Sequence, residues 1–264
     1  YKVMVMKKVF WIILCMFFIL PVTFAGNMKL HYERPAEYFE EALVIGNGTM
    51  GATLYGGVKK DKISFNDITL WTGEPESENS SPDAFNVIPE IRALLDNEDY
   101  EGADKAQYKV QGHYSENYQP LGTLTIEYLD DTAGISDYHR WLDIGNATAR
   151  TQYLKDGKLF TSDYFASAPD SVIVIRLKSE NKEGIHALLS FDSPLPHSSQ
   201  VADNEISVEG YAAYHSFPVY YKAEDKHRYD PERGIHFKTL VRVLSVDGSV
   251  KLSLIHISEP TRPY

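Results

Sequence analysis

Residues 42–73 read ALVIGNGTMGATLYGG, then VKKDKISFND, then ITLWTG, and this stretch decides the fold. Within it GNGTMG, residues 46–51, matches the G-x-G-x-x-G pattern of a dinucleotide-binding turn. That pattern works only where a helix begins inside it and turns its N-terminus toward a pyrophosphate. The β-prone segment Ala52–Tyr55 follows instead, and a helix there would lose about 1 kcal/mol at each of Gly56 and Gly57. The stretch therefore favours a β-meander over a nucleotide site.

The meander is expected to contain four short strands. The apolar and β-branched runs place them at Leu43–Ile45, Ala52–Tyr55, Ile63–Phe65 and Ile68–Trp71. Gly and Asn tolerate positive φ and suit the turn between the first two strands. Asn66-Asp67 is expected to form the turn before the fourth strand.

Beyond the meander the sequence predicts one helical interruption and then strands. A helix with Pro89 in its first turn, and a second short helix from Tyr100, form the interruption. Asp156-Gly157 between two β-prone runs is a strong hairpin signal. Val172–Ile175 is apolar on both faces, which predicts a central strand. The fold class is mainly β: an antiparallel β-sandwich of the super-sandwich type with a short helical insertion.

Both ends of the chain are expected to lie outside this domain. Lys7-Lys8, an apolar run of about 12 residues and the small-residue site at Thr23-Phe24-Ala25 indicate a secretory signal over residues 1–25, with upstream read-through in 1–5. The run is shorter than the ~20 residues of a membrane span. Residues 253–264 resemble translated adapter sequence. We expect a domain over 26–252, secreted or periplasmic and free of the membrane once the signal is cleaved.

Composition narrows the partners and the chemistry. The 26 Lys+Arg against 37 Asp+Glu give a net charge of −11, which disfavours nucleic acid. The single cysteine, Cys15, falls in the expected signal and offers the domain neither a disulfide nor a thiolate ligand. No cofactor, metal or catalytic residue is assigned, since no H-x-x-x-H helix pattern or G-x-S-x-G elbow occurs. Two metal ligands supplied by strands remain an open alternative.

Several segments occur in an order found in one enzyme family. They are the two halves of the opening stretch, residues 42–57 and 62–75, then YQPLG at 118–122 and FASAPDSV at 165–172. Together they resemble the N-terminal domain of glycoside hydrolase family 95, which contains α-L-fucosidases and related α-L-galactosidases. The resemblance covers roughly residues 30–250. This chain departs from the family pattern with Val44 for Pro, Met50 for Leu, Ile68 for Thr and Thr123 for Asp or Asn.

The resemblance implies a non-catalytic β-sandwich that precedes an (α/α)6 barrel in the same polypeptide. In the family the general acid and the residues that activate water lie in that barrel, which acts with inversion on terminal α-L-fucosyl or α-L-galactosyl groups. We therefore expect a chain truncated before the barrel and inactive alone, with the barrel and a glycan as partners. The alternatives are a stand-alone carbohydrate-binding sandwich and a purely structural module.

Four residues are candidates for contact with substrate or with a neighbouring domain: Trp71, Thr72, Tyr118 and Gln119. Trp71 ends one expected strand and Tyr118 precedes another, so both should lie at strand ends, where loops present binding residues. Their flat rings suit either sugar stacking or an interdomain seam. The competing interpretation is that Trp71 fills the core.

Overall fold

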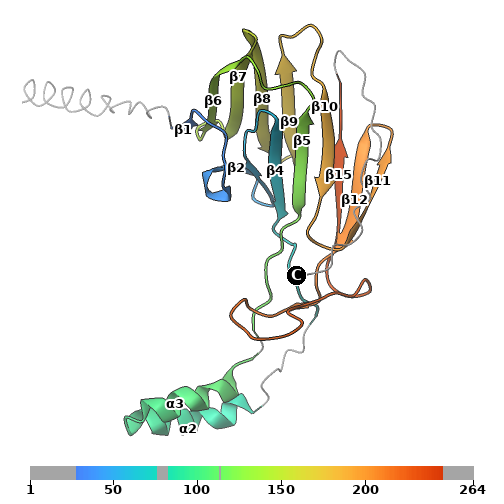
Figure 1. Ribbon diagram of the computed structural model, residues 1–264. Coiled ribbons are helices and arrows are strands. Elements are labelled where there is room, and N and C mark those ends of the chain that lie inside the picture. The colour runs from blue at the N-terminus through green and yellow to red at the C-terminus, as the bar shows by residue number, and fades with distance from the viewer. Residues whose placement is uncertain (1–27, 76–82, 113, 246–264) are drawn as a thin grey trace, which may run out of the picture.

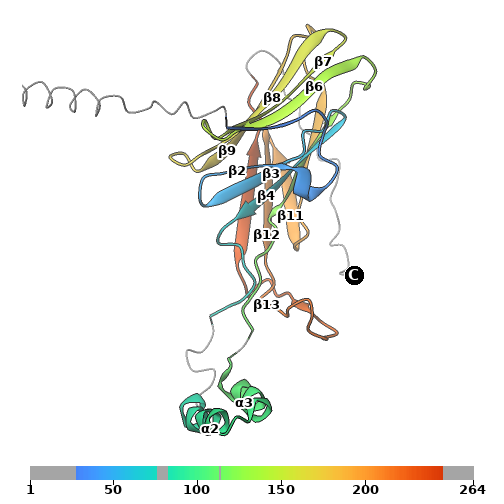
Figure 2. The same cartoon turned by 90° about the vertical axis from the view of Figure 1, so that its left-hand side faces the viewer.

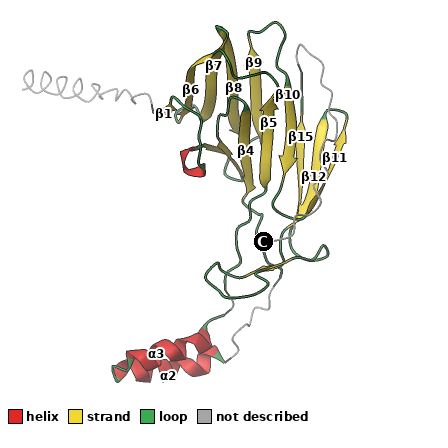
Figure 3. Ribbon diagram, in the orientation of Figure 1, coloured by secondary structure: helices red, strands yellow, loops and turns green. Residues whose placement is uncertain are grey.

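The computed structural model describes residues 28–75, 83–112 and 114–245 (Figure 1). The expected signal at 1–25, with Cys15, and the tail at 253–264 lie outside the described residues. Strands far outnumber helices, which confirms the mainly β class (Figure 3). Among the described residues, no helix combines the length and the apolar character needed to cross a membrane.

Two five-stranded antiparallel sheets form the sandwich (Figures 1 and 2). The first has the order β1 (Lys29–Tyr32), β6 (Ile135–Asp143), β7 (Thr148–Lys155), β8 (Lys158–Ser167) and β9 (Val172–Ser179). The second has the order β10 (Ala187–Asp192), β5 (Gly122–Tyr128), β4 (Lys60–Asp67), β3 (Met50–Leu54) and β2 (Leu43–Gly46). Two smaller sheets follow: β11 (His197–Ala202), β12 (Glu205–Tyr211) and β15 (His236–Arg242); and β13 (His215–Ser216) with β14 (His227–Arg228).

The core lies between the sheets because alternate residues of each strand point inward. On β5 the buried residues are Leu124, Ile126 and Tyr128, as expected from the alternation in the sequence. A buried polar contact links the two large sheets through this core: the Tyr164 hydroxyl on β8 donates to Asp61 Oδ2 on β4 at 2.7 Å. Burial raises the pKa of the Asp61 carboxyl to about 6.

The meander is confirmed in its first three strands and wrong in its fourth. β2, β3 and β4 pair in sequence order, but β4 continues through Asn66-Asp67, where a turn was expected. Asp67 Oδ1 accepts from the Thr69 amide at 2.9 Å and from the Thr69 hydroxyl at 2.6 Å, so the aspartate side chain forms the turn after the strand. Trp71 makes only an isolated bridge to Tyr118.

The expectation that the strand at Val172–Ile175 lies in the middle of its sheet is also wrong. β9 lies at the end of the first sheet's strand order. Ile173 and Ile175 pack against the core, while Val174 pairs with Phe165 of β8. Apolar residues on both faces of a strand depend on what packs against those faces. They do not show whether neighbouring strands pair with both of its edges. The Asp156-Gly157 hairpin between β7 and β8 is confirmed, with both residues at positive φ.

The helical insertion is a hairpin that extends away from one end of the sandwich (Figures 1 and 2). It comprises α2 (Ala84–Asp96) and α3 (Tyr100–Gln107), followed by the 3-10 turn Tyr108–Val110; a second such turn, Phe39–Glu41, precedes β2. Pro89 is the sixth residue of α2, not part of its first turn as expected, because the helix begins earlier, at Ala84. No residue of α2 is buried, and Phe85 is 82% exposed.

Candidate functional site

Trp71 and Tyr118 meet at the end of the second sheet that faces the helical hairpin. Their backbones form an isolated antiparallel bridge, and their ring centroids lie 5.4 Å apart at an interplanar angle of 51°. The Trp71 indole donates to the Ile68 carbonyl at 3.0 Å, which fixes the ring. The two residues are 43% and 44% exposed, so Trp71 is not part of the buried core. The pair offers an aromatic surface held by its own backbone.

The other two sequence candidates lie beneath this pair. Thr72 and Gln119 are buried, and the backbone bonds Thr72 N to Asn117 O at 2.8 Å and Gln119 N to Leu70 O at 2.9 Å hold the two segments together. The structure thus brings all four candidates to one place but divides them. Two present rings to solvent, and two anchor the backbone below.

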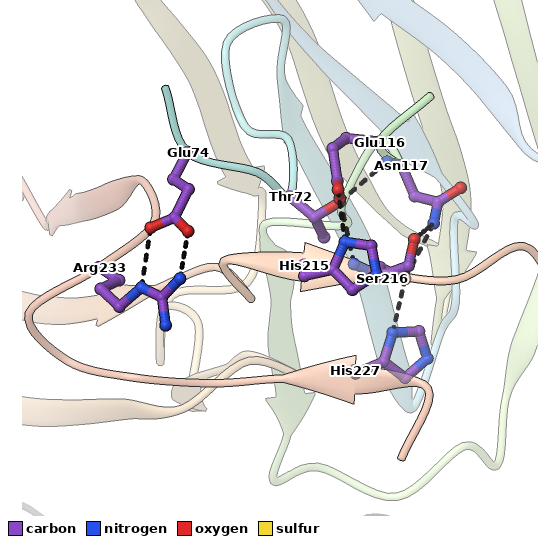
Figure 4. A network of polar contacts seen from close by, with 8 residues as sticks. All are labelled: Thr72, Glu74, Glu116, Asn117, His215, Ser216, His227 and Arg233. Carbon is purple, nitrogen blue, oxygen red and sulfur yellow. Dashed lines mark hydrogen bonds and ion pairs between the residues drawn. The ribbon is translucent and has the colours of Figure 1, made fainter. Parts of the chain in front are cut away.

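Beneath the aromatic pair, a polar network is centred on Glu116 (Figure 4). Its carboxylate accepts from the Thr72 hydroxyl and, at 3.0 Å, from the Ser216 amide. Its other oxygen lies 2.7 Å from His215 Nδ1. Glu116 and His215 are each about one-quarter exposed at the side chain. The carboxylate therefore ties the Trp71 segment to the short β13–β14 sheet.

Asn117 extends the network to the second short strand (Figure 4). Its side-chain amide donates to the Ser216 carbonyl at 3.0 Å and to the Ser216 hydroxyl at 2.8 Å. That hydroxyl lies 2.8 Å from His227 Nδ1 on β14. Ser216 is buried and every polar group named here has a partner, so the network is a rigid support.

A second polar link lies beside the first. Arg233 pairs with both carboxylate oxygens of Glu74 and lies 3.6 Å from the ring centroid of Tyr214 (Figure 4). Gly73, between the two links, has φ +116°, and a Cβ there would lie 2.9 Å from Glu116 Cγ. Glycine is required at this position both by the backbone conformation and by the close approach of Glu116.

The loop between β13 and β14 adds further exposed rings to this end of the molecule. Phe217 stacks on Tyr221 at 4.7 Å between centroids, and Tyr114 meets Tyr221 edge-on at 5.6 Å. Tyr220 and Val219 are largely exposed. We call the exposed side chains of this end the aromatic end: Trp71, Tyr114, Tyr118, Val219 and Tyr220.

The sequence alone did not reveal the Glu116 network. Glu116 and His215 are 99 residues apart, and no local spacing signals that they meet. Chemically, the arrangement can hold backbone segments and present rings. The carboxylates of Glu116 and Glu74 serve as acceptors for neighbouring groups.

One other concave surface lies over the three-stranded sheet. A groove of about 750 Å³ is lined by residues of β11, β12 and β15, among them Tyr211, His236 and Lys238. The Tyr211 and His236 rings lie 5.8 Å apart. The groove combines a ring with charged side chains, and none of the four sequence candidates lines it.

Comparison with known proteins places this architecture in a family. The family described as glycosyl hydrolase family 65, N-terminal domain, matches residues 30–259. "Alpha-L-fucosidase 2" of Arabidopsis thaliana is 31% identical over 84% of this chain and 27% of its own length. "Probable alpha-fucosidase A" of Aspergillus niger is 30% identical over 61% of this chain and 21% of its own length. The chain thus spans about a quarter of these relatives. It belongs to the family of glycosyl hydrolase family 65 N-terminal domains.

Proposed function

We propose that this chain is the non-catalytic N-terminal β-sandwich of a secreted α-fucosidase of the glycoside hydrolase family 95 type, whose catalytic (α/α)6 barrel follows in the same polypeptide. The parent enzyme would remove terminal α-L-fucosyl or α-L-galactosyl groups from glycans. The aromatic end would form the seam with the barrel. Residues 1–25 would serve as the export signal, and residues 253–264 would not be part of the native domain.

The observation that carries the seam is the exposed Trp71–Tyr118 pair above the Glu116 network. Two adjacent rings, each more than two-fifths exposed, are held by backbone bonds and a fully partnered polar support. An exposed apolar surface on a rigid base is typical of an interface. The helical hairpin extends from the same end of the sandwich (Figure 1), and it exposes Phe85 and Tyr100.

The relatives support the enzymatic context. Two proteins named as α-fucosidases match this chain over only 27% and 21% of their own length. The rest of such a polypeptide has room for a separate catalytic domain.

The seam predicts different effects of one substitution in two proteins. Trp71→Ala should lower the unfolding free energy of the isolated chain by about 1–2 kcal/mol, because it removes the contact with Tyr118 and the indole hydrogen bond to the Ile68 carbonyl. In the polypeptide extended through the following domain, it should lower the unfolding free energy further, because the contact with that domain is lost as well. Leu240→Ala, at an exposed position of β15, is the matched control. Equal effects of Trp71→Ala in both proteins would refute the seam.

Activity and sugar binding provide the second test. We expect no turnover of an aryl α-L-fucoside by the isolated chain above a heat-killed control, and turnover by the extended polypeptide. L-Fucose should leave the fluorescence of Trp71 unchanged in a Trp141→Phe variant that begins at Gly26. A saturable change would instead favour direct sugar contact.

A second candidate function is a stand-alone carbohydrate-binding module, and the groove over the three-stranded sheet favours it. Ligand sites combine aromatic side chains with a few polar groups that orient the ligand, and Tyr211 with His236 and Lys238 offers such a set. If this function holds, Tyr211→Ala should abolish binding to a fucosylated glycan array, while Trp71→Ala should not. Absence of glycan binding by the isolated chain would remove this candidate.

A further inference from the structure

We propose that His31, Glu33 and His139 form a binding site for a divalent transition-metal ion of the zinc class. One ligand atom from each residue lies within 4.8 Å of the other two. The site is on the first sheet, at the edge strand β1 and its neighbour β6, as the ribbon shows (Figure 1). It is separate from the aromatic end and does not depend on the proposed function.

Strand register explains why these residues share a face. β1 pairs with β6 so that His31 is opposite Trp141, and Tyr32 is opposite Arg140. Residues two apart on a strand point the same way, so His139 lies on the face of Trp141, next to His31. Glu33 follows β1 in a bend, and one of its carboxylate oxygens lies within 4.8 Å of the histidine ligand atoms. Arg140 points inward and donates to the carbonyls of Arg34 and Glu41 at 2.7 and 2.9 Å, which anchors the chain just beyond Glu33.

The two imidazoles already have the spacing of a metal site. His31 Nε2 and His139 Nδ1 lie 3.2 Å apart. Two nitrogens bound to zinc at about 2.05 Å in a tetrahedral arrangement would lie about 3.3 Å apart. Glu33 is exposed, so rotation of its side chain can bring the carboxylate to the third position, and water would take the fourth.

A second observation points independently to a ligand. His139 Nε2 lies 3.0 Å from Asp137 Oδ1, so this nitrogen carries the proton and donates to the carboxylate. The lone pair of His139 Nδ1 then faces His31. A carboxylate that fixes the histidine tautomer in this way is the usual outer support of a metal-bound imidazole. A bulge in β6 between Ser136 and His139, with Asp137 at φ 51°, places that carboxylate.

The chemistry of the metal-ligand atoms also determines which class of ion would bind. Two neutral imidazoles with two nearby carboxylates, Glu33 and Asp137, give a local charge of −2, which a divalent cation balances. Imidazole ligands suit zinc, copper and nickel, whereas magnesium and calcium prefer oxygen. The bound ion would join β1 to β6 through side chains, in addition to the backbone pairing.

The test is calorimetric titration of the untagged chain with zinc chloride, followed by thermal unfolding. We expect one zinc per chain, a higher melting temperature with zinc, and no response to magnesium. His31→Ala and His139→Ala should abolish both effects. Asp137→Asn should weaken zinc binding at least about tenfold. Since asparagine tolerates the left-handed backbone, this variant changes the carboxylate and keeps the bulge.

His186→Ala is the matched control, because this exposed histidine also lies beside an aspartate, 3.6 Å from Asp130, but outside the cluster. It should bind zinc as the unsubstituted chain does. Glu33→Gln changes only an exposed side chain and should weaken binding even if a histidine variant were to misfold. Absence of binding at about 100 μM free zinc, or binding that survives both His31→Ala and Glu33→Gln, would overturn the proposal.

Discussion

Replacing the buried Asp61 by asparagine should change how the stability of the chain depends on pH. The pKa of Asp61 is about 6 in the folded chain, mainly because burial disfavours the charged form, whereas the ordinary pKa of an aspartate is 3.8. Between these values the folded chain binds more protons than the unfolded chain. The free energy of unfolding therefore falls as pH rises through this interval.

The size of the effect follows from the shift. A difference of about two pKa units corresponds to about 3 kcal/mol, which is fully present only well below pH 3.8, amounts to about 2.5 kcal/mol at about pH 4, and is lost above about pH 6. Tyr128 and Tyr153, whose pKa values burial raises, remain protonated over this range and do not obscure it. In Asp61→Asn the side-chain oxygen can still accept from Gly57 N, and its NH2 can donate to the Tyr164 hydroxyl.

The assay is urea unfolding followed by circular dichroism at about pH 4 and pH 7.5. The unfolding free energy of the unsubstituted chain minus that of Asp61→Asn should be about 2.5 kcal/mol larger at the lower pH. Asp203→Asn, at an exposed turn, is the control, because it measures how the loss of a surface carboxylate changes the unfolding free energy. A difference that is constant with pH, or that grows as pH rises, would refute the assignment of a protonated Asp61.

Three further predictions concern packing, each measured by urea unfolding. Gly73→Ala should destabilise the chain more than Gly48→Ala, because both glycines have positive φ but only at Gly73 does a Cβ meet a neighbour; equal losses would contradict the close contact. Glu116→Ala should cost about 1–3 kcal/mol, since the buried Ser216 amide then loses its acceptor, and a neutral result would show that the network does not contribute to stability. Ile63→Ala should cost about 2–5 kcal/mol, whereas Ile68→Ala at an exposed turn should cost less than about 0.5 kcal/mol.

Local features of the fold could be predicted from sequence because short-range chemistry determines them. The alternation on β5 and the Asp156-Gly157 turn need only a few neighbouring residues. The strand expected at Ile68–Trp71 failed because the Asp67 side chain, not the apolar pattern, sets where the turn falls. The order of strands in a sheet cannot be read from a short stretch of sequence, which explains why β9 was wrongly expected in the middle of its sheet.

The candidate sites divide in the same way, into features that the local sequence shows and features that depend on the fold. Trp71 and Tyr118 could be singled out because aromatic residues at strand ends are visible in the sequence. Glu116 with His215, and His31 with His139, are each about a hundred residues apart. Each pair meets only through the register of strands or the arrangement of loops, so no spacing in the sequence could have revealed either.

The position of β9 has a consequence for how copies of the chain behave in concentrated solution. In the part of the chain that the structure describes, β9 pairs with β8 on one side, and no strand pairs with its other side. Its segment Val172–Ile175 is rich in β-branched residues, which favours edge-to-edge pairing between molecules. Arg176 and Lys178 follow directly, and two such edges meeting would bring like charges together. Replacing Arg176 and Lys178 by neutral residues would remove this charge repulsion and so favour fibrillar aggregation.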